Sequence, residues 1–309
     1  MKVLLTGAYQ YSNEQICKIE QLGWEVIFIK NELTALDIPV DEFEAVVCNA
    51  LFLYNDITKF KKLKMVQATS AGLERLPLEY MKKNQILYYN AKDVYSIPMA
   101  EWAVMNVLEF YKNAYSFFEK QQNKKWEKDR TLQELTNKKV CIVGYGSVGR
   151  EIAKRLSAFG AEITAVNRSE PDNKYIQKWN PLEQVDQALS EADIIILSIA
   201  LAEETKNLIN QDRLNAMKQD SVLINISRGE ILDQDVLLQL LKKGKFRGVA
   251  LDVFKEEPLS ESSELWELPQ VIITPHNSFV GDKVRERMFN VIYHNLKSVG
   301  EQANGVLFG

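Results

Sequence analysis

The chain has 309 residues, of which 46% are hydrophobic and 26% charged, and it carries a formal net charge of -4 at pH 7. It is long enough for two domains with hydrophobic cores of their own. No apolar run reaches the length of a membrane span, and no basic stretch has interleaved aromatic residues. We therefore expect neither a membrane nor a nucleic acid as a partner.

The first part of the chain alternates between predicted strands and helices, as an open α/β unit does. Its first apolar segment, residues 3–6, indicates a strand rather than a signal peptide. Ile16, Ile19 and Leu22 lie at helical spacing and predict a short helix. Further strands are predicted at residues 24–29, 45–48 and 65–68.

The three cysteines, Cys17, Cys48 and Cys141, lie far apart in apolar segments. Their separation does not match the spacing of metal ligands, so we expect no metal site. We interpret them as reduced core residues of a cytoplasmic protein.

A long helix is predicted next, beginning near the Ser-Ile-Pro sequence at residues 96–98. Its apolar residues recur at helical spacing and predict one continuous helix that leads into a second domain. These residues are Ala103, Val107, Phe110, Ala114 and Phe117.

A glycine fingerprint, G-x-G-x-x-G, follows the apolar strand predicted at residues 139–143. Gly144 permits a tight turn out of the strand, and Gly146 lets a phosphate approach the bare backbone. Gly149 lets the following helix pack closely on the sheet. The pattern predicts a dinucleotide site, with about 140 residues of other structure before it.

The helix that follows the fingerprint places its first N–H groups, at Ser147 and Val148, toward the pyrophosphate. An apolar stripe through Val148, Ile152, Leu156 and Phe159 supports this helix. A strand, a glycine turn and an amphipathic helix together are stronger evidence than the motif alone.

The next strand ends at Asn167, Arg168 and Ser169, where NAD-binding proteins of this kind carry an acidic residue. A carboxylate would repel the 2′-phosphate of NADP, whereas Arg168 and Ser169 can bind it. The sequence therefore favours NADP over NAD. The alternative is a solvated arginine, and Arg150 is similarly open between a phosphate contact and an exposed helix residue.

The rest of the chain repeats the strand–helix pattern of a parallel sheet covered on both faces. Helices are predicted at residues 233–243 and about 282–299, and the last would return to the first domain and make it discontinuous. The strands are predicted at residues 162–166, 194–198, 222–226, 248–253 and 271–274.

Three polar residues follow successive strands of this part, at the sheet edge where open α/β folds bind ligands. They are Arg228, Glu257 and His276. Each has a simpler interpretation: an exposed charge, a solvated loop acid and a structural histidine. Their coincidence at three strand ends favours a catalytic site. His294, the only other histidine, falls in the predicted last helix and is interpreted as a surface residue.

The chain resembles the D-isomer-specific 2-hydroxyacid dehydrogenases over essentially its whole length. The resemblance depends on S-R-G at 227–229, E-E-P at 256–258 and T-P-H at 274–276, in this order behind the fingerprint. Residues 70–72 (S-A-G) and 98–101 (P-M-A-E) also fit the family pattern.

This resemblance implies an α/β fold of two Rossmann-like or flavodoxin-like domains with parallel sheets. The NAD(P)-binding domain, residues 99–279, would be inserted into a smaller, discontinuous substrate domain of residues 1–98 and 280–309. The active site would lie in the cleft between the domains.

The resemblance also assigns roles that suit the side chains. Arg228 would bind the carboxylate of a 2-keto acid through its planar guanidinium, and His276 would exchange the proton, since histidine titrates near neutral pH. Glu257 would orient the imidazole, and Asp252 matches the family position that contacts the nicotinamide carboxamide. Backbone N–H groups would bind the substrate carboxylate at Ser70, Ala71 and Gly72.

The resulting hypothesis is an oxidoreductase that reduces a small 2-keto acid, with glyoxylate- and hydroxypyruvate-like substrates favoured. One alternative is a phosphoglycerate dehydrogenase-like enzyme, for which Arg75 is a candidate phosphate ligand. The other is an NAD(P)-sensing, corepressor-like binding protein. The resemblance also implies a homodimer, to which the long helix could contribute. Phe279 could shape the pocket or pack at the domain junction, and Trp266 could reach the cleft or pack.

Overall fold

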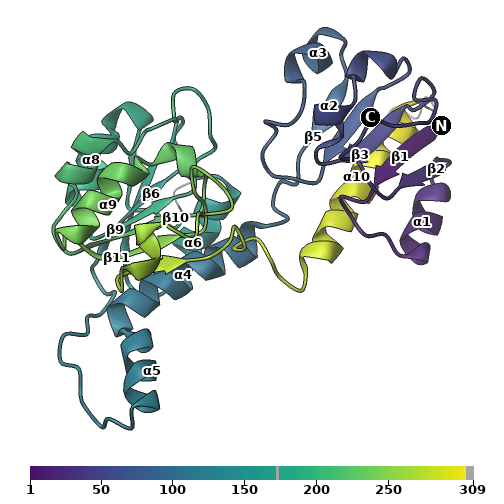
Figure 1. Cartoon of the computed structure of the whole chain (residues 1–309). Coiled ribbons are helices and arrows are strands. Elements are labelled where there is room, and N and C mark those ends of the chain that lie inside the picture. Colours follow the sequence, from purple (N-terminus) through teal and green to yellow (C-terminus); the bar gives the residue numbers. More distant parts are fainter. Residues whose placement is uncertain (172–173, 304–309) are drawn as a thin grey trace. The chain divides into compact units, whose positions relative to one another are not determined.

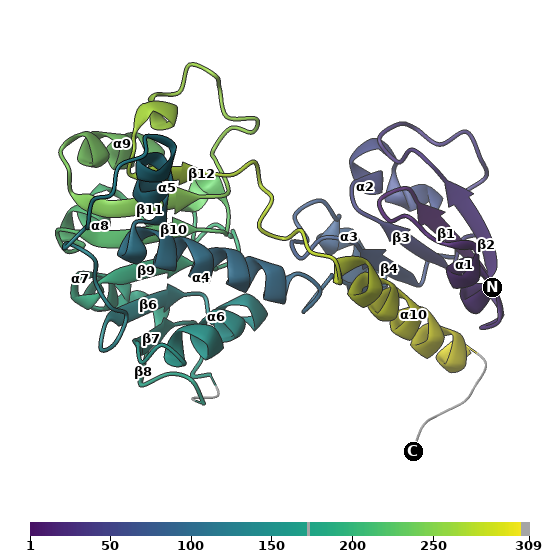
Figure 2. The ribbon, with the colours of Figure 1, turned by 90° about the horizontal axis from the view of Figure 1, so that it is seen from below.

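The computed structural model describes residues 1–171 and 174–303. The chain divides into two compact units (Figures 1 and 2). The first comprises Met1–Tyr95 and Gly281–Gly309, and the second comprises Ser96–Val280. The expected domain boundaries, after residues 98 and 279, stay predictions. The predicted α/β class with two parallel sheets is confirmed.

The first unit is a five-stranded parallel sheet in the order β2-β1-β3-β4-β5 with helices on both faces. Alternate residues of β1 face opposite sides: Val3 and Leu5 pack with α1 and α10, and Leu4 packs with α2 and α3. Short apolar runs suit such strands because both faces are buried. The strands are β1 (Lys2–Thr6), β2 (Glu25–Ile29), β3 (Ala45–Cys48), β4 (Met65–Ala68) and β5 (Leu87–Tyr89), and the helices are α1 (Asn13–Glu20), α2 (Leu51–Tyr54), α3 (Leu78–Lys83) and α10 (Val284–Ala303).

The last helix, α10, belongs to the first unit although the whole second unit separates it from β5 in the sequence. Ile292 and Leu296 are fully buried against the sheet. The Trp24 indole donates to the Leu296 carbonyl at 3.2 Å, and the Asn295 amide donates to Gln67 at 2.6 Å. The predicted return of the final helix is therefore observed, and His294 is exposed on it.

The second unit is a seven-stranded parallel sheet in the order β12-β11-β10-β9-β6-β7-β8. Helices α4 and α6 pack on one face, and α7, α8 and α9 pack on the other (Figure 2). The strand order reverses between β6 and β9, the kind of switch point at which doubly wound sheets bind ligands. The strands are β6 (Lys139–Val143), β7 (Glu162–Val166), β8 (Lys178–Asn180), β9 (Ile194–Leu197), β10 (Ser221–Asn225), β11 (Phe246–Leu251) and β12 (Val271–Ile273), and the helices are α4 (Ser96–Lys112), α5 (Ala114–Gln122), α6 (Ser147–Ser157), α7 (Val185–Glu191), α8 (Gln211–Ala216) and α9 (Gln234–Lys242).

The predicted long helix begins at Ser96 as expected, but the prediction that it continues without a break to Phe117 is wrong. Helix α4 ends at Lys112, and Asn113 adopts a left-handed conformation with φ of 50° before α5 begins at Ala114. Asparagine tolerates this conformation better than most residues. Helix α5 and the following loop form an arm that extends from the sheet of this unit (Figure 1).

Two smaller expectations are also corrected. Cys17 is exposed rather than part of the core, because α1 turns it away from the sheet. Burial raises the pKa of the Cys141 thiol to about 12 and raises that of Cys48 as well. Phe159 lies beyond the end of α6 and is half exposed, so the buried stripe of that helix ends at Leu156.

No helix among the described residues is long and apolar enough to span a membrane.

Candidate active site

The glycine fingerprint lies between β6 and α6, and each of its glycines meets a different constraint. Gly144 has φ of 95°, and a Cβ there would come within 2.5 Å of the Ile199 Cα. At Gly149 a Cβ would lie 2.4 Å from the Gly144 carbonyl oxygen. A Cβ at Gly146, by contrast, would meet open space. The turn is thus closely packed against the protein at Gly144 and Gly149 and open at Gly146, as a phosphate-binding turn must be.

The N-terminus of α6 faces this open space with its backbone. Gly146 is the N-cap residue and provides no side-chain cap. The first N–H groups of a helix lack partners within the helix and carry a partial positive charge. The N–H groups at Ser147, Val148 and Gly149 therefore suit a pyrophosphate, and the residues present fit a dinucleotide.

The tip of β7 carries Asn167, Arg168 and Ser169, and no acid follows the strand directly. The Asn167 amide donates to the Ser169 carbonyl at 3.0 Å, and the Trp179 indole donates to the Asn167 carbonyl at 3.2 Å. The Arg168 guanidinium forms an ion pair with the Glu204 carboxylate, which comes from the loop after β9. Spacing in the sequence could not reveal this acid, because it lies 36 residues away.

Arg228 follows β10 in a turn that the buried side chain of Asn225 organises. The Asn225 Oδ1 accepts from the Ser227 N–H at 3.0 Å, and its amide donates to the Arg228 carbonyl at 3.1 Å. The Ser227 Oγ is buried and has no hydrogen-bond partner among the described residues. Asn225 is a site residue that sequence reasoning missed, because nothing in the pattern distinguishes it from an ordinary strand-end residue.

Gly229 brings the Arg228 turn against the loop after β11. A Cβ at Gly229 would lie 1.9 Å from the Phe254 carbonyl carbon, so no larger residue fits without displacement of one of the two backbones. The Phe254 N–H in turn donates to the Glu257 Oε1 at 3.0 Å. Backbone contact thus places Arg228 on the loop next to the one that carries Glu257.

Glu257 and His276 are in direct contact. The Glu257 Oε2 lies 2.9 Å from the His276 Nδ1, and both side chains are more than a third exposed. The His276 ring also meets Phe279 edge to face, with the ring centroids 6.0 Å apart. The carboxylate fixes which ring nitrogen faces it and leaves Nε2 for another partner. This is the geometry of an acid–base histidine with an orienting carboxylate.

Asp252 holds the loop that carries His276. Its carboxylate is fully buried and accepts from the Thr274 hydroxyl at 2.5 Å and from the Asn277 and Ser278 N–H groups at 2.7 and 2.9 Å. The His276 N–H donates to the Asp252 carbonyl at 2.8 Å. Both carboxylate oxygens thus accept hydrogen bonds from the protein. The expected contact of Asp252 with the nicotinamide stays a prediction.

Ser70, Ala71 and Gly72 follow β4 in the first unit. The Ser70 hydroxyl donates to the Gly72 carbonyl at 2.7 Å, and the Asn90 amide donates to the Ala71 carbonyl at 2.7 Å. The Ala71 and Gly72 carbonyl groups thus accept hydrogen bonds from side chains of the protein. Among the described residues, no group of three or more His, Cys, Asp or Glu side chains could hold a metal ion.

The remaining aromatic candidate, Trp266, lies in a short 3-10 helix (Glu264–Glu267) of the second unit. Its indole donates to the Ser260 carbonyl at 3.0 Å, and about half of the residue is exposed. The indole is therefore fastened to its own loop.

Comparison with known proteins gives concordant matches. The sequence profile of the D-isomer specific 2-hydroxyacid dehydrogenase, NAD binding domain, matches residues 104–278. A glyoxylate reductase from Pyrococcus furiosus is 30% identical over 246 residues, which are 76% of this chain and 72% of that protein. A D-3-phosphoglycerate dehydrogenase from Methanocaldococcus jannaschii is 30% identical over 257 residues, which are 81% of this chain but 48% of that protein. The crystal structure of the TT0316 protein from Thermus thermophilus has a TM-score of 0.78 at 27% identity, with 98% of this chain and 97% of that chain covered.

A switch point in a parallel sheet, a glycine fingerprint and an open helix N-terminus define a dinucleotide-binding domain. With the matches above, the chain belongs to the D-isomer-specific 2-hydroxyacid dehydrogenase family. It is an NAD(P)-dependent enzyme that acts on the CH–OH group of donors.

Proposed function

We propose that this enzyme reduces a small 2-keto acid, with glyoxylate- and hydroxypyruvate-like substrates preferred, and that Arg228, Glu257 and His276 are its catalytic residues. The observation that carries this proposal is the 2.9 Å contact between Glu257 and His276 beside the Arg228 turn. The glyoxylate reductase from Pyrococcus furiosus supports the substrate class.

When bound, the cofactor would supply a hydride to the keto carbon, and residues of the protein would bind the substrate and exchange the proton. Arg228 binds the carboxylate with its two-pronged guanidinium and polarises the neighbouring carbonyl. Backbone N–H groups at Ser70, Ala71 and Gly72 bind the same carboxylate. His276 gives a proton from Nε2 to the developing alkoxide and takes one in the reverse direction. Glu257 holds the imidazole at Nδ1 and stabilises its positive charge.

Consumption of NADPH with a panel of 2-keto acids tests this proposal. We expect turnover with glyoxylate and hydroxypyruvate, and a D-configured product wherever the product is chiral. Preferential turnover of phosphohydroxypyruvate would favour the phosphoglycerate dehydrogenase-like alternative, in which Arg75 would bind the phosphate. Tight cofactor binding without turnover of any keto acid would favour the sensing protein instead.

We further propose that NADPH is the preferred cofactor. The residues that support this are Arg168 and Ser169 at the tip of β7, together with Asn167, which holds the tip through its side chain. Arg168 is two-thirds exposed, so a 2′-phosphate could reach its guanidinium.

Arg168→Ala tests the cofactor proposal. We expect the KM for NADPH to rise roughly tenfold to a hundredfold, because a charge-assisted contact is lost. The KM for NADH should change little. Steady-state kinetics with each cofactor measures both values, and equal effects on the two cofactors would contradict the assignment.

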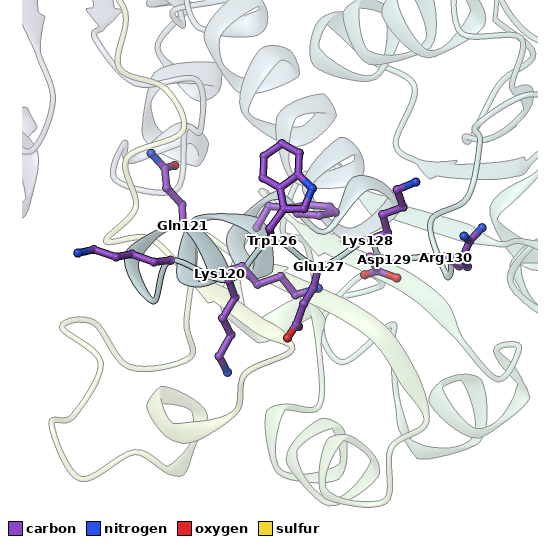
Figure 3. A pocket seen from close by; sticks show the side chains of 10 residues that line it. Lys120, Gln121, Trp126, Glu127, Lys128, Asp129 and Arg130 are labelled. Carbon is purple, nitrogen blue, oxygen red and sulfur yellow. The ribbon is translucent and has the colours of Figure 1, made fainter.

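We also propose that the enzyme is a homodimer that works in the cytoplasm, where its three free thiols would stay reduced. The support for a dimer is the arm formed by α5 and the loop after it. Trp126 is 99% exposed, and it lines a hollow of about 890 Å³ together with Phe117 and charged residues such as Lys120 and Arg130 (Figure 3). A tryptophan that is almost fully exposed on such an arm is typical of a side chain that becomes buried in an interface.

A further inference from the structure

One ion pair in the second unit joins two loops that flank the glycine fingerprint. Arg168 follows β7, and Glu204 lies in the loop after β9. The last residue of β7 and the loop after β9 both contact the fingerprint turn: the Gly144 N–H donates to the Val166 carbonyl at 2.8 Å, and the Ile199 Cα would lie within 2.5 Å of a Cβ at Gly144. The pair therefore lies beside the turn that would hold a dinucleotide, and both of its side chains are more than half exposed.

The turn that carries Glu204 is firmly built. Thr205 is almost fully buried, and its hydroxyl accepts from the Ala202 N–H at 2.7 Å and donates to the Ala200 carbonyl at 2.8 Å. Two residues after Thr205, the Asn207 N–H donates to the Glu230 carbonyl at 2.7 Å. Hydrogen bonds on both sides of Glu204 thus hold its backbone, and the ion pair with Arg168 keeps its carboxylate near the β7 tip.

The tip of the second strand is where this fold distinguishes the two cofactors, because the ribose 2′ position is bound there. An acid at that tip accepts hydrogen bonds from the 2′-OH of NAD and repels the 2′-phosphate of NADP. Here β7 ends without such an acid, but Glu204 brings a carboxylate to the same guanidinium that would bind the phosphate. The two side chains therefore have opposite effects on the same ligand group.

We propose that Glu204 is a cofactor-specificity residue that lowers the enzyme's preference for NADPH over NADH. It neutralises Arg168 in the free protein, repels the 2′-phosphate, and offers an acceptor to the 2′-OH of NADH. This inference depends on the proposed role of Arg168 in binding NADPH. It makes the discrimination modest, since exposed ion pairs in water are weak and a phosphate can compete for the guanidinium.

Glu204→Gln in the full chain tests the inference, with 2′,5′-ADP and 5′-ADP as probes in titration calorimetry. We expect the variant to bind 2′,5′-ADP roughly threefold to tenfold more tightly, because a like charge is removed and Arg168 is released. Binding of 5′-ADP should stay the same or weaken. Glu203→Gln is the matched control: Glu203 is the adjacent exposed acid, and neither affinity should change beyond about twofold in it.

Two results would contradict the proposed role of Glu204. An unchanged ratio of the two affinities in Glu204→Gln would overturn the inference. Weaker binding of 2′,5′-ADP would overturn it too, because Glu204 would then position Arg168 rather than oppose it.

Arg168→Ala, measured in the same way, separates this inference from the proposal on which it depends. If Arg168→Ala lowers affinity for 2′,5′-ADP alone while Glu204→Gln changes nothing, only the inference about Glu204 fails. If Arg168→Ala affects both probes equally, the proposed NADPH preference fails, and the inference fails with it. In the double variant the gain from Glu204→Gln should shrink, because no guanidinium remains to be released.

Discussion

His276 owes its position to two acidic residues, Asp252 and Glu257. Its backbone has φ of 51°, in the left-handed region, and is held there by the Asp252 carbonyl and by the loop that the Asp252 carboxylate binds. Glu257 holds the ring. The strand-end pattern could predict Glu257 and His276, since their chemistry is visible in the sequence. It could not predict what Asp252 does here, because that depends on how the loop folds back over a buried carboxylate.

Glu257→Gln tests the pairing with His276. We expect kcat for keto-acid reduction to fall roughly a hundredfold or more, because an amide neither stabilises the imidazolium nor holds one orientation of the ring. Cofactor affinity should stay within about twofold. Steady-state kinetics and a cofactor titration measure both. Glu256→Gln is the control, since Glu256 is an exposed neighbour, and a comparable loss in that variant would contradict the assignment.

Among the elements, the α4–α5 break shows where periodicity fails. The apolar spacing continues from Ala103 to Phe117, yet Asn113 interrupts the helix. Hydrophobic spacing indicates which side chains favour burial. It does not indicate that a single residue adopts the left-handed conformation. The edge strands β5 and β8 were missed because their residues, Leu-Tyr-Tyr and Lys-Trp-Asn, do not form the aliphatic run that predicts the equally short β12. The turn at Asn225 could not be predicted from the sequence either, because its hydrogen bonds exist only in the folded loop.

The arm that follows this break gives a prediction about assembly. Trp126→Ala should raise the dimer dissociation constant about tenfold or more, because an exposed tryptophan of this kind dominates an interface when it is buried. Light scattering across a dilution series measures it. Leu53→Ala, which removes an apolar side chain that is 59% exposed in the first unit, should leave the constant unchanged. A monomeric wild-type protein, or equal effects of both variants, would contradict the role of the arm.

At the scale of the whole molecule, the glycine fingerprint near residue 144 is the feature from which most of the architecture could be predicted. Its position after a complete α/β pattern predicted a second domain, which the family resemblance implied to be an inserted nucleotide-binding domain. The family and both parallel sheets are as expected. The cofactor site shows the limit of such reasoning. Arg168 could be identified from its place at a strand end, but Glu204 is its neighbour only in space.

The central claim is that this chain reduces 2-keto acids with a proton from His276, and one measurement tests it most directly. NADPH consumption with glyoxylate and hydroxypyruvate should be compared between the wild-type enzyme and His276→Asn, with NADPH affinity measured in parallel. We predict turnover by the wild-type enzyme and a loss of roughly a hundredfold or more in the variant, with unchanged cofactor binding. The claim would be contradicted if His276→Asn turned over 2-keto acids as fast as the wild-type enzyme does. It would also be contradicted if the wild-type enzyme turned over no 2-keto acid.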